Sequence, residues 1–205
     1  MLIQVFFLSF IISLVGTLPP ATINISVMQL SLKGKSKSGY YLAFGASIID
    51  TLYAALAVQV QIYLAKQIEF TNYFYLIAAA VLLFLGIFSI RSKVSSHDIT
   101  AISDEKIGFL KGVVLGVLNP LAMPFWLGVT TYLKVNGLIV LDGINYWAYV
   151  VGVFVGELGL LIIIVKVGSK FTRVADNHRI VNVIPGVAFI ILGLVNLIQW
   201  VSYYI

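Results

Sequence analysis

The chain consists of long apolar segments that short polar stretches separate. The segments run at 2–32, 39–64, 71–90, 108–133, 145–167 and 181–203. A helix needs about 20 residues to cross about 30 Å of hydrocarbon, and each segment reaches that length. The pattern predicts an all-α integral membrane protein with six transmembrane helices in one membrane domain.

Helix breakers interrupt the first and the fourth segment. The first would be about 46 Å long as one straight helix, which is too long for a simple crossing. Pro19 and Pro20 divide it, and Asn119, Pro120 and Pro124 interrupt the fourth. Proline removes a backbone donor, and within hydrocarbon the freed groups must face protein or a water-filled cavity. We therefore expect two broken helices beside a transport path.

Composition supports the membrane assignment and removes some chemistry. Hydrophobic residues make up 60% of the chain and charged residues 10%, with a mean hydropathy of +1.04. No cysteine is present, which excludes disulfides and thiolate metal sites. Residues 1–32 contain no Lys or Arg, so the first segment lacks the positive start of a signal peptide. We read it as a retained span.

Positive charges predict the orientation, because cytoplasmic flanks are enriched in Lys and Arg. Of the 13 Lys and Arg residues, only Lys66 and Lys134 fall on one side of the predicted membrane. The other side holds Lys33, Lys35, Lys37, Arg91, Lys93, Lys106, Lys111, Lys166, Lys170, Arg173 and Arg179. Both termini are thus expected outside. The net charge of +5 reflects topology, and no nucleic-acid partner is expected.

The two halves of the chain repeat a pattern. Residues 16–20 and 116–120 both read Gly-x-Leu-x-Pro. Each half also has an acid five residues after one glycine and 36 residues before another: Gly45, Asp50 and Gly86, then Gly152, Glu157 and Gly193.

Three spans per repeat would bring the second half into the membrane from the opposite side. This inverted-repeat plan is found in many secondary transporters. We expect one three-helix repeat at 1–90, a cytoplasmic linker at 91–107 and a second repeat at 108–205.

Asp50 and Glu157 are the only acids inside the apolar segments, and both lie near the middle of one. A carboxylate at the membrane centre costs at least about 2.5 to 3.5 kcal/mol, so both should face the bundle interior. No Lys or Arg lies at that depth. Each acid could be protonated, meet a cationic substrate group or bind a cation. The alternative is a neutral acid that hydrogen-bonds a neighbouring helix.

Other polar residues lie beside the acids and the breaks. Half-helix ends present unpaired N–H and C=O groups that can hold a zwitterion. Asn24 and Asn119 add uncharged polar groups near the two breaks. Tyr53, one turn after Asp50, could hydrogen-bond to it or to substrate, or only pack. We take these residues as candidate substrate-binding groups.

Glycines recur every four residues at two places. They are Gly108, Gly112 and Gly116 in the fourth segment and Gly152 and Gly156 in the fifth. Small residues at this spacing allow helices to approach closely. We expect close helix packing there, and such faces also permit a homodimer.

Short motifs resemble the LysE/RhtB type of amino-acid exporter. They are the proline break in the first segment, Gly45, Asp50 and Tyr53 in the second, and residues 108–110 with 119–122 in the fourth. The resemblance covers nearly the whole chain. It implies a bacterial inner-membrane exporter of amino acids or their derivatives that uses the proton gradient and no cofactor.

The chain departs from this family at two positions. The family usually has Pro-Gly-Pro where residues 18–20 read Leu-Pro-Pro, and usually Asn-Pro-Lys-Ala where Leu121 replaces the lysine. Leu121 removes a partner for a substrate carboxylate.

The preferred function is proton-coupled export of amino acids or related small amines, with the lipid bilayer and the small-molecule substrate as partners. A divalent-cation exporter of the same architecture is one alternative, since carboxylate and carbonyl oxygens suit hard cations. A non-transporting membrane scaffold is another. An enzyme is not expected, because no nucleophile, base and orienting group share one depth.

Overall fold

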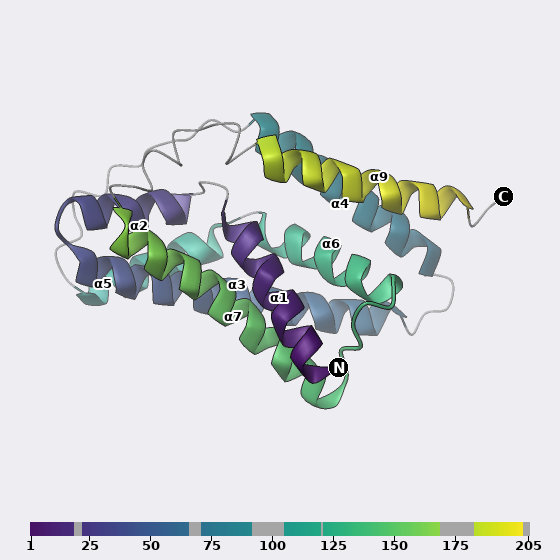
Figure 1. The fold of residues 1–205 in the computed structure, drawn as a ribbon, viewed down its shortest axis with the longest axis horizontal. Coiled ribbons are helices and arrows are strands. Elements are labelled where there is room, and N and C mark those ends of the chain that lie inside the picture. The colour runs from purple at the N-terminus through teal and green to yellow at the C-terminus, as the bar shows by residue number, and fades with distance from the viewer. Residues whose placement is uncertain (19–21, 66–70, 92–104, 120, 169–182, 203–205) are drawn as a thin grey trace.

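The computed structural model describes residues 1–18, 22–65, 71–91, 105–119, 121–168 and 183–202 (Figure 1). The helices are α1 (Leu2–Thr17), α2 (Thr22–Leu32), α3 (Ser36–Ala65), α4 (Thr71–Arg91), α5 (Glu105–Val117), α6 (Ala122–Val135), α7 (Gly143–Lys166) and α9 (Ile184–Ser202). No strand occurs in the described ranges. The predicted all-α class is confirmed for these residues, and the outer ends of the predicted segments that fall on them lie within three residues of helix ends. The predicted ends at 181 and 203 lie outside the described residues.

The helices differ in how they could cross a membrane. α3 and α7 are each long and apolar enough to span it alone. The pairs α1 with α2 and α5 with α6 also qualify if each bent pair counts as one span, while α4 and α9 contain shorter apolar stretches. The described helices thus supply two to four spans by this measure, and six spans remain a prediction.

Both expected helix breaks are present. α1 ends at Thr17, and α2 continues at 74° to it. α5 ends at Val117, and α6 continues at 63° to it. Each preceding half-helix ends at the second residue of its Gly-x-Leu-x-Pro pattern. Pro19, Pro20 and Pro120 lie outside the described residues.

Pro124 does not lie at a break. It is the third residue of α6, which Leu121 precedes as N-cap residue. The N–H groups of a first helical turn have no partner within the helix, so proline is tolerated there. The sequence reading of Pro124 as a helix-breaking residue is corrected: α5 and α6 separate before it.

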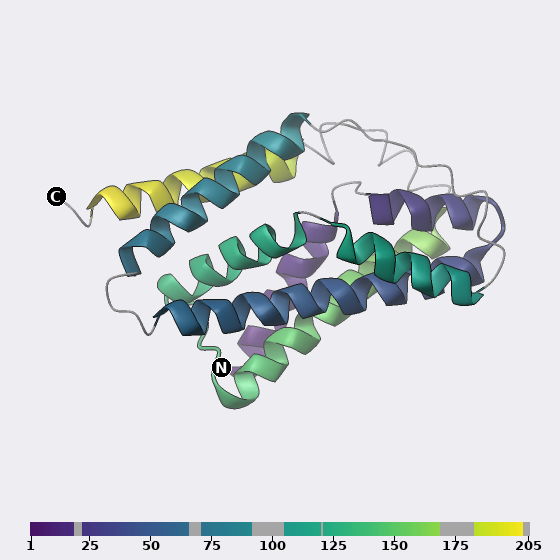
Figure 2. The same ribbon diagram turned by 180° about the vertical axis from the view of Figure 1, so that it is seen from behind.

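Three helix pairs build the bundle: α1 packs against α7, α3 against α5, and α4 against α9. Figure 2 shows α4 and α9 together along one edge of the molecule. Exposed apolar side chains such as Phe7, Leu56 and Ile163 cover the outside of the bundle, as a lipid-facing surface requires.

Glycines allow the close pairs. A Cβ atom at Gly112 of α5 would lie 2.9 Å from the carbonyl carbon of Leu42 in α3. A Cβ atom at Gly156 of α7 would lie 2.9 Å from the Cβ of Ser13 in α1. Real Cβ atoms essentially never approach so closely, so the expectation of close packing at these glycines is confirmed.

Two hydrophobic clusters fill the interior between α3 and α7. One contains Leu42, Ala43 and Ala46 of α3 together with the second half of α7, including Leu161 and Ile164. The other contains Ala54, Ala57 and Val58 of α3 with Tyr149 and Val153 of α7. Position 50 of α3 and position 157 of α7 fall between the two clusters. The fold therefore leaves a polar layer in the middle of an apolar bundle.

Candidate functional site

Asp50 and Glu157 meet in this middle layer. Each lies fourteen residues after the start of its helix, about 21 Å along the axis. The two carboxyl groups lie within hydrogen-bonding reach of each other. Glu157 is 3% exposed, whereas Asp50 is half-buried. The structure thus brings together the two acids that the repeat pattern singled out.

Trp126 is the third member of the site. Its indole Nε1–H donates a hydrogen bond of 2.9 Å to Oδ2 of Asp50. The residue lies in the first half of α6, after the second break, and is almost fully buried. A rigid, buried donor of this kind fixes the orientation of the Asp50 carboxyl group. Trp126 was not among the residues predicted from the sequence.

Tyr149 of α7 completes the aromatic wall of the site. Its ring packs edge-to-face on Trp126 with 6.2 Å between centroids. Its hydroxyl group is fully buried and finds no hydrogen-bond partner among the described residues. A buried hydroxyl without a partner costs about 1–3 kcal/mol, and a ligand that bonds to it would recover that cost.

Further oxygen atoms in this layer lack partners in the described part of the chain. They include Oε2 of Glu157 and the buried hydroxyl oxygens of Ser47 and Thr51, which flank Asp50 on α3. Buried polar groups in folded proteins are normally satisfied. Unpaired oxygen atoms around a carboxyl pair can accept hydrogen bonds from a proton-carrying or amine-carrying ligand.

Side chains from α3 and from the connection itself organise the break between α5 and α6. Oδ1 of Asn119 accepts a 3.2 Å hydrogen bond from the N–H of Leu121. The Tyr53 hydroxyl donates a 3.0 Å hydrogen bond to the carbonyl oxygen of Val117, the last residue of α5. Tyr53, which lies one turn from Asp50 on α3, therefore stabilises the end of α5. Asn119 stabilises the connection in which it lies.

The break between α1 and α2 has a matching contact. Nδ2 of Asn24 in α2 donates a hydrogen bond to the carbonyl oxygen of Thr17, the last residue of α1. Thr17 and Val117 occupy the same place in the repeated Gly-x-Leu-x-Pro pattern. At both breaks, a side chain thus satisfies the last carbonyl group of the first half-helix, as an apolar medium requires.

The site offers few ligands for a metal ion. Within the described ranges, no three His, Cys, Asp or Glu side chains lie close enough together to hold one. The acid pair supplies two carboxyl groups, and the indole N–H that bonds to Asp50 is a donor only.

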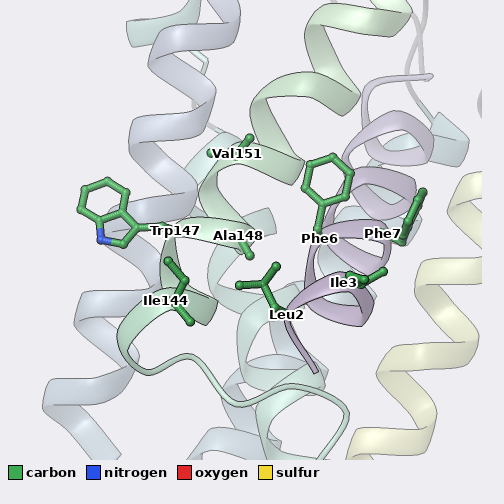
Figure 3. A pocket seen from close by; sticks show the side chains of 8 residues that line it. All are labelled: Leu2, Ile3, Phe6, Phe7, Ile144, Trp147, Ala148 and Val151. Atoms are coloured by element: carbon green, nitrogen blue, oxygen red, sulfur yellow. The ribbon is translucent and has the colours of Figure 1, made fainter.

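A separate groove of about 420 Å³ lies between the first turns of α1 and α7 (Figure 3). Apolar and aromatic side chains line it: Leu2, Ile3, Phe6, Phe7, Ile144, Trp147, Ala148 and Val151. None of the site residues contributes to it. Its lining suits a lipid chain and supplies no chemistry for transport.

The sequence positions of Trp126 and Tyr149 place them near the break and the acid, but do not single them out. Trp126 follows the second break closely, and Tyr149 lies two helical turns before Glu157 on the same helix. Both are large aromatic residues in apolar segments, where a packing role is the ordinary expectation. Only the meeting of α3, α6 and α7 distinguishes them from the other aromatic residues.

Comparison with known proteins agrees with this architecture. No curated protein and no solved structure matches the chain significantly. A family model described as the LysE type translocator matches residues 14–199, which include both helix breaks, both acids and Trp126. The match covers most of the chain, and the family is one of transporters rather than enzymes. The chain belongs to the LysE type translocator family and is a multi-pass membrane transport protein.

Proposed function

We propose that this protein is a proton-coupled secondary exporter of amino acids or related small amines, and that Asp50 and Glu157 carry protons and the substrate amine in alternation. The proton-motive force drives it, and no cofactor is needed. The protein lies in a bacterial inner membrane with both termini outside.

The observation that carries this proposal is the close approach of the two carboxyl groups, which lie within hydrogen-bonding reach of each other inside the bundle. A carboxylate has no proton to donate, so two carboxyl groups can hydrogen-bond directly only when at least one is protonated. We therefore expect the pair to share a proton when no substrate is bound. A substrate ammonium group can replace that proton because it donates up to three hydrogen bonds and compensates the negative charge.

Substrate entry would use the unpaired atoms of the middle layer. Oε2 of Glu157 and the Tyr149 hydroxyl are available acceptors, and the faces of Trp126 and Tyr149 attract cations. Leu121 at the start of α6 offers only its backbone and an apolar side chain. These features favour a substrate whose amine is recognised more strongly than its carboxylate.

The arrangement of helices supports two inverted repeats, at 1–90 and 108–205, joined by the linker 91–107. α1 runs parallel to α7 in their contact, since Gly152 meets Phe6 and Gly156 meets Phe10. α5 runs parallel to α3 in the same way, and the Lys37–Glu105 ion pair of 3.9 Å joins their starts. A twofold exchange of the halves converts one pair into the other, as inverted repeats require.

Transport by purified protein in lipid vesicles tests the proposal. When a pH gradient is imposed across the vesicle membrane, we expect labelled amino acids or small amines to move against their own concentration gradient. The direction of their movement should be opposite to that of the protons. A protonophore should abolish the accumulation. Vesicles without protein provide the baseline.

A ligand screen by thermal unfolding accompanies the transport assay, because a ligand that binds only the folded state raises apparent stability. Stabilisation by amines and not by divalent ions is expected. Stabilisation by Mn²⁺, Mg²⁺ or Ca²⁺ alone, with metal transport, would assign a cation exporter instead. No response in either assay would contradict a transport role at this site and favour a scaffold.

Trp126→Phe tests the positioning of Asp50. The substitution keeps an aromatic ring but removes the N–H that bonds to Asp50. A hydrogen bond of this kind contributes about 0.5–1.5 kcal/mol, so we expect the transport rate to fall by roughly two- to thirteenfold. Trp147→Phe is the matched control, since Trp147 is 61% exposed on the outside of α7. Equal loss in both variants would show that the hydrogen bond has no role in transport.

A further inference from the structure

Exchanging the two halves of the chain relates α1 to α5, α2 to α6, α3 to α7 and α4 to α9. Several contacts obey this exchange. Under this exchange the contact α1–α7 becomes α5–α3, and the contact α2–α7 becomes α6–α3. The contacts α3–α7 and α4–α9 each map onto themselves. All of these contacts are present. The helices α1, α3, α5 and α7 therefore form a symmetric frame.

The frame is also closely packed. Gly112 and Gly156 leave no room for a Cβ atom against the backbone or side chains of the neighbouring helix. The Ser13 hydroxyl donates a 2.8 Å hydrogen bond to the carbonyl oxygen of Val153 and so joins α1 to α7. Close backbone contacts of this kind resist sliding, because no flexible side chain lies between the helices to adjust.

Other contacts break the symmetry, and each of them involves α2 or α6. α4 packs against α6, whereas α9 has no packing of comparable extent with α2 in the described helices. Similarly, the backbone of α2 lies close to α3 and α5, whereas α6 meets α7 and α1 through large side chains, with Trp126 against Tyr149 and Phe125 against Gly16. In Figure 2 the pair α4–α9 approaches the end of α6 and diverges from α2. The asymmetric helices are those that follow the two breaks.

We propose that this structure is one of two conformations between which the protein alternates. In the other conformation, α9 packs against α2 and α4 no longer contacts α6. The frame of α1, α3, α5 and α7 is the same in both. The inference rests on the proposed function, because a second conformation is what opens the acid pair to the opposite side of the membrane. α4 and α9 move together, since a Cβ atom at Gly86 would lie 2.7 Å from the carbonyl oxygen of Gly186.

The repeat assigns the residues that meet in the second conformation. In the structure, a Cβ atom at Gly128 of α6 would lie 3.5 Å from Cγ of Leu82 in α4. When the halves are aligned on the glycines that begin the repeated Gly-x-Leu-x-Pro patterns, Gly128 is equivalent to Met28 of α2. When they are aligned on the two acids, Leu82 is equivalent to Phe189 of α9. Met28 and Phe189 are thus predicted to come into contact when α4 leaves α6.

Paired cysteines test this prediction, and the absence of native cysteine removes any background. The pair Leu82→Cys with Gly128→Cys reports the observed conformation, and the pair Met28→Cys with Phe189→Cys reports the second. Both are treated in membranes with a short bifunctional thiol reagent. Because cross-linking is irreversible over the reaction time, it accumulates even a minor conformation. The four single variants serve as controls.

We expect both pairs to cross-link within one chain, each cross-link to stop transport, and reversal of a cleavable link to restore it. Spin labels at positions 28 and 189 should show two distances. The inference would be overturned if the 82/128 pair reacts but the 28/189 pair, although properly inserted, never cross-links and its spin labels show one long distance. That outcome would leave the proposed function intact. Exchange between both pairs without transport of any amine would support the inference and contradict only the proposed function.

Discussion

Asp50→Asn and Glu157→Gln are each expected to reduce proton-coupled transport by about 100-fold or more, equal to at least about 2.7 kcal/mol. Neither amide can release a proton or compensate an ammonium charge. The substitutions preserve shape, and the amide introduced at position 50 retains an oxygen that can accept the hydrogen bond from Trp126. Initial rates in vesicles with an imposed pH gradient measure the effect.

Glu105→Gln provides the control for these variants. Glu105 lies at the start of α5 and forms an exposed ion pair with Lys37, a kind of contact that contributes little to stability. We expect its transport rate to equal that of the unaltered protein. All three variants should insert and unfold at similar temperatures. Unimpaired transport by both acid variants would refute the assignment of the site.

Gly112→Ala and Gly156→Ala are expected to destabilise the folded protein by about 1–3 kcal/mol or more, the range for forcing extra volume into a packed interior. The added methyl group at position 112 would meet the backbone of Leu42 and Ala46, and at position 156 it would meet Phe10 and Ser13. Backbone cannot move aside as a flexible side chain can. Thermal unfolding in detergent, with membrane yield, measures the loss.

Gly159→Ala is the matched control. Gly159 lies three residues after Gly156 on α7, and a Cβ atom there would meet nothing within 4 Å. Alanine is the better helix former by about 0.5–1 kcal/mol, so we expect unchanged or slightly raised stability. Equal destabilisation by Gly156→Ala and Gly159→Ala would mean that helix packing is not what requires glycine at position 156.

Helix breaks and glycine contacts were predictable from the sequence because their causes are local or periodic. Proline in an apolar segment interrupts helical hydrogen bonding wherever it occurs, and both predicted breaks are present between α1 and α2 and between α5 and α6. Glycines spaced by four lie on one helix face regardless of the partner. The position of Pro124 was less predictable, since proline in a first turn is harmless and the start of α6 at Ala122 decides its effect.

The candidate site was predictable only in part. Asp50 and Glu157 stood out because charge in hydrocarbon is costly, and the repeat suggested that they approach each other. Tyr53 was a candidate partner of Asp50, but its hydroxyl group bonds to Val117 instead. Trp126 and Tyr149 carried no distinguishing pattern, and their roles in transport stay predictions, as do those of the two acids.

Sequence alone was enough to predict the membrane class, the two interruptions, the pair of acids and, among the described residues, the helix boundaries to within three residues. Each depends on composition, hydrophobic length or the local chemistry of proline and carboxyl groups, which act wherever the segment is placed. Three features depend on the tertiary structure alone. Trp126 donates a hydrogen bond to Asp50, and the Tyr149 hydroxyl has no partner among the described residues. α4 packs against α6, whereas α9 does not pack to a comparable extent against α2 in the described helices. These depend on the crossing of helices distant in the chain, which no local pattern encodes.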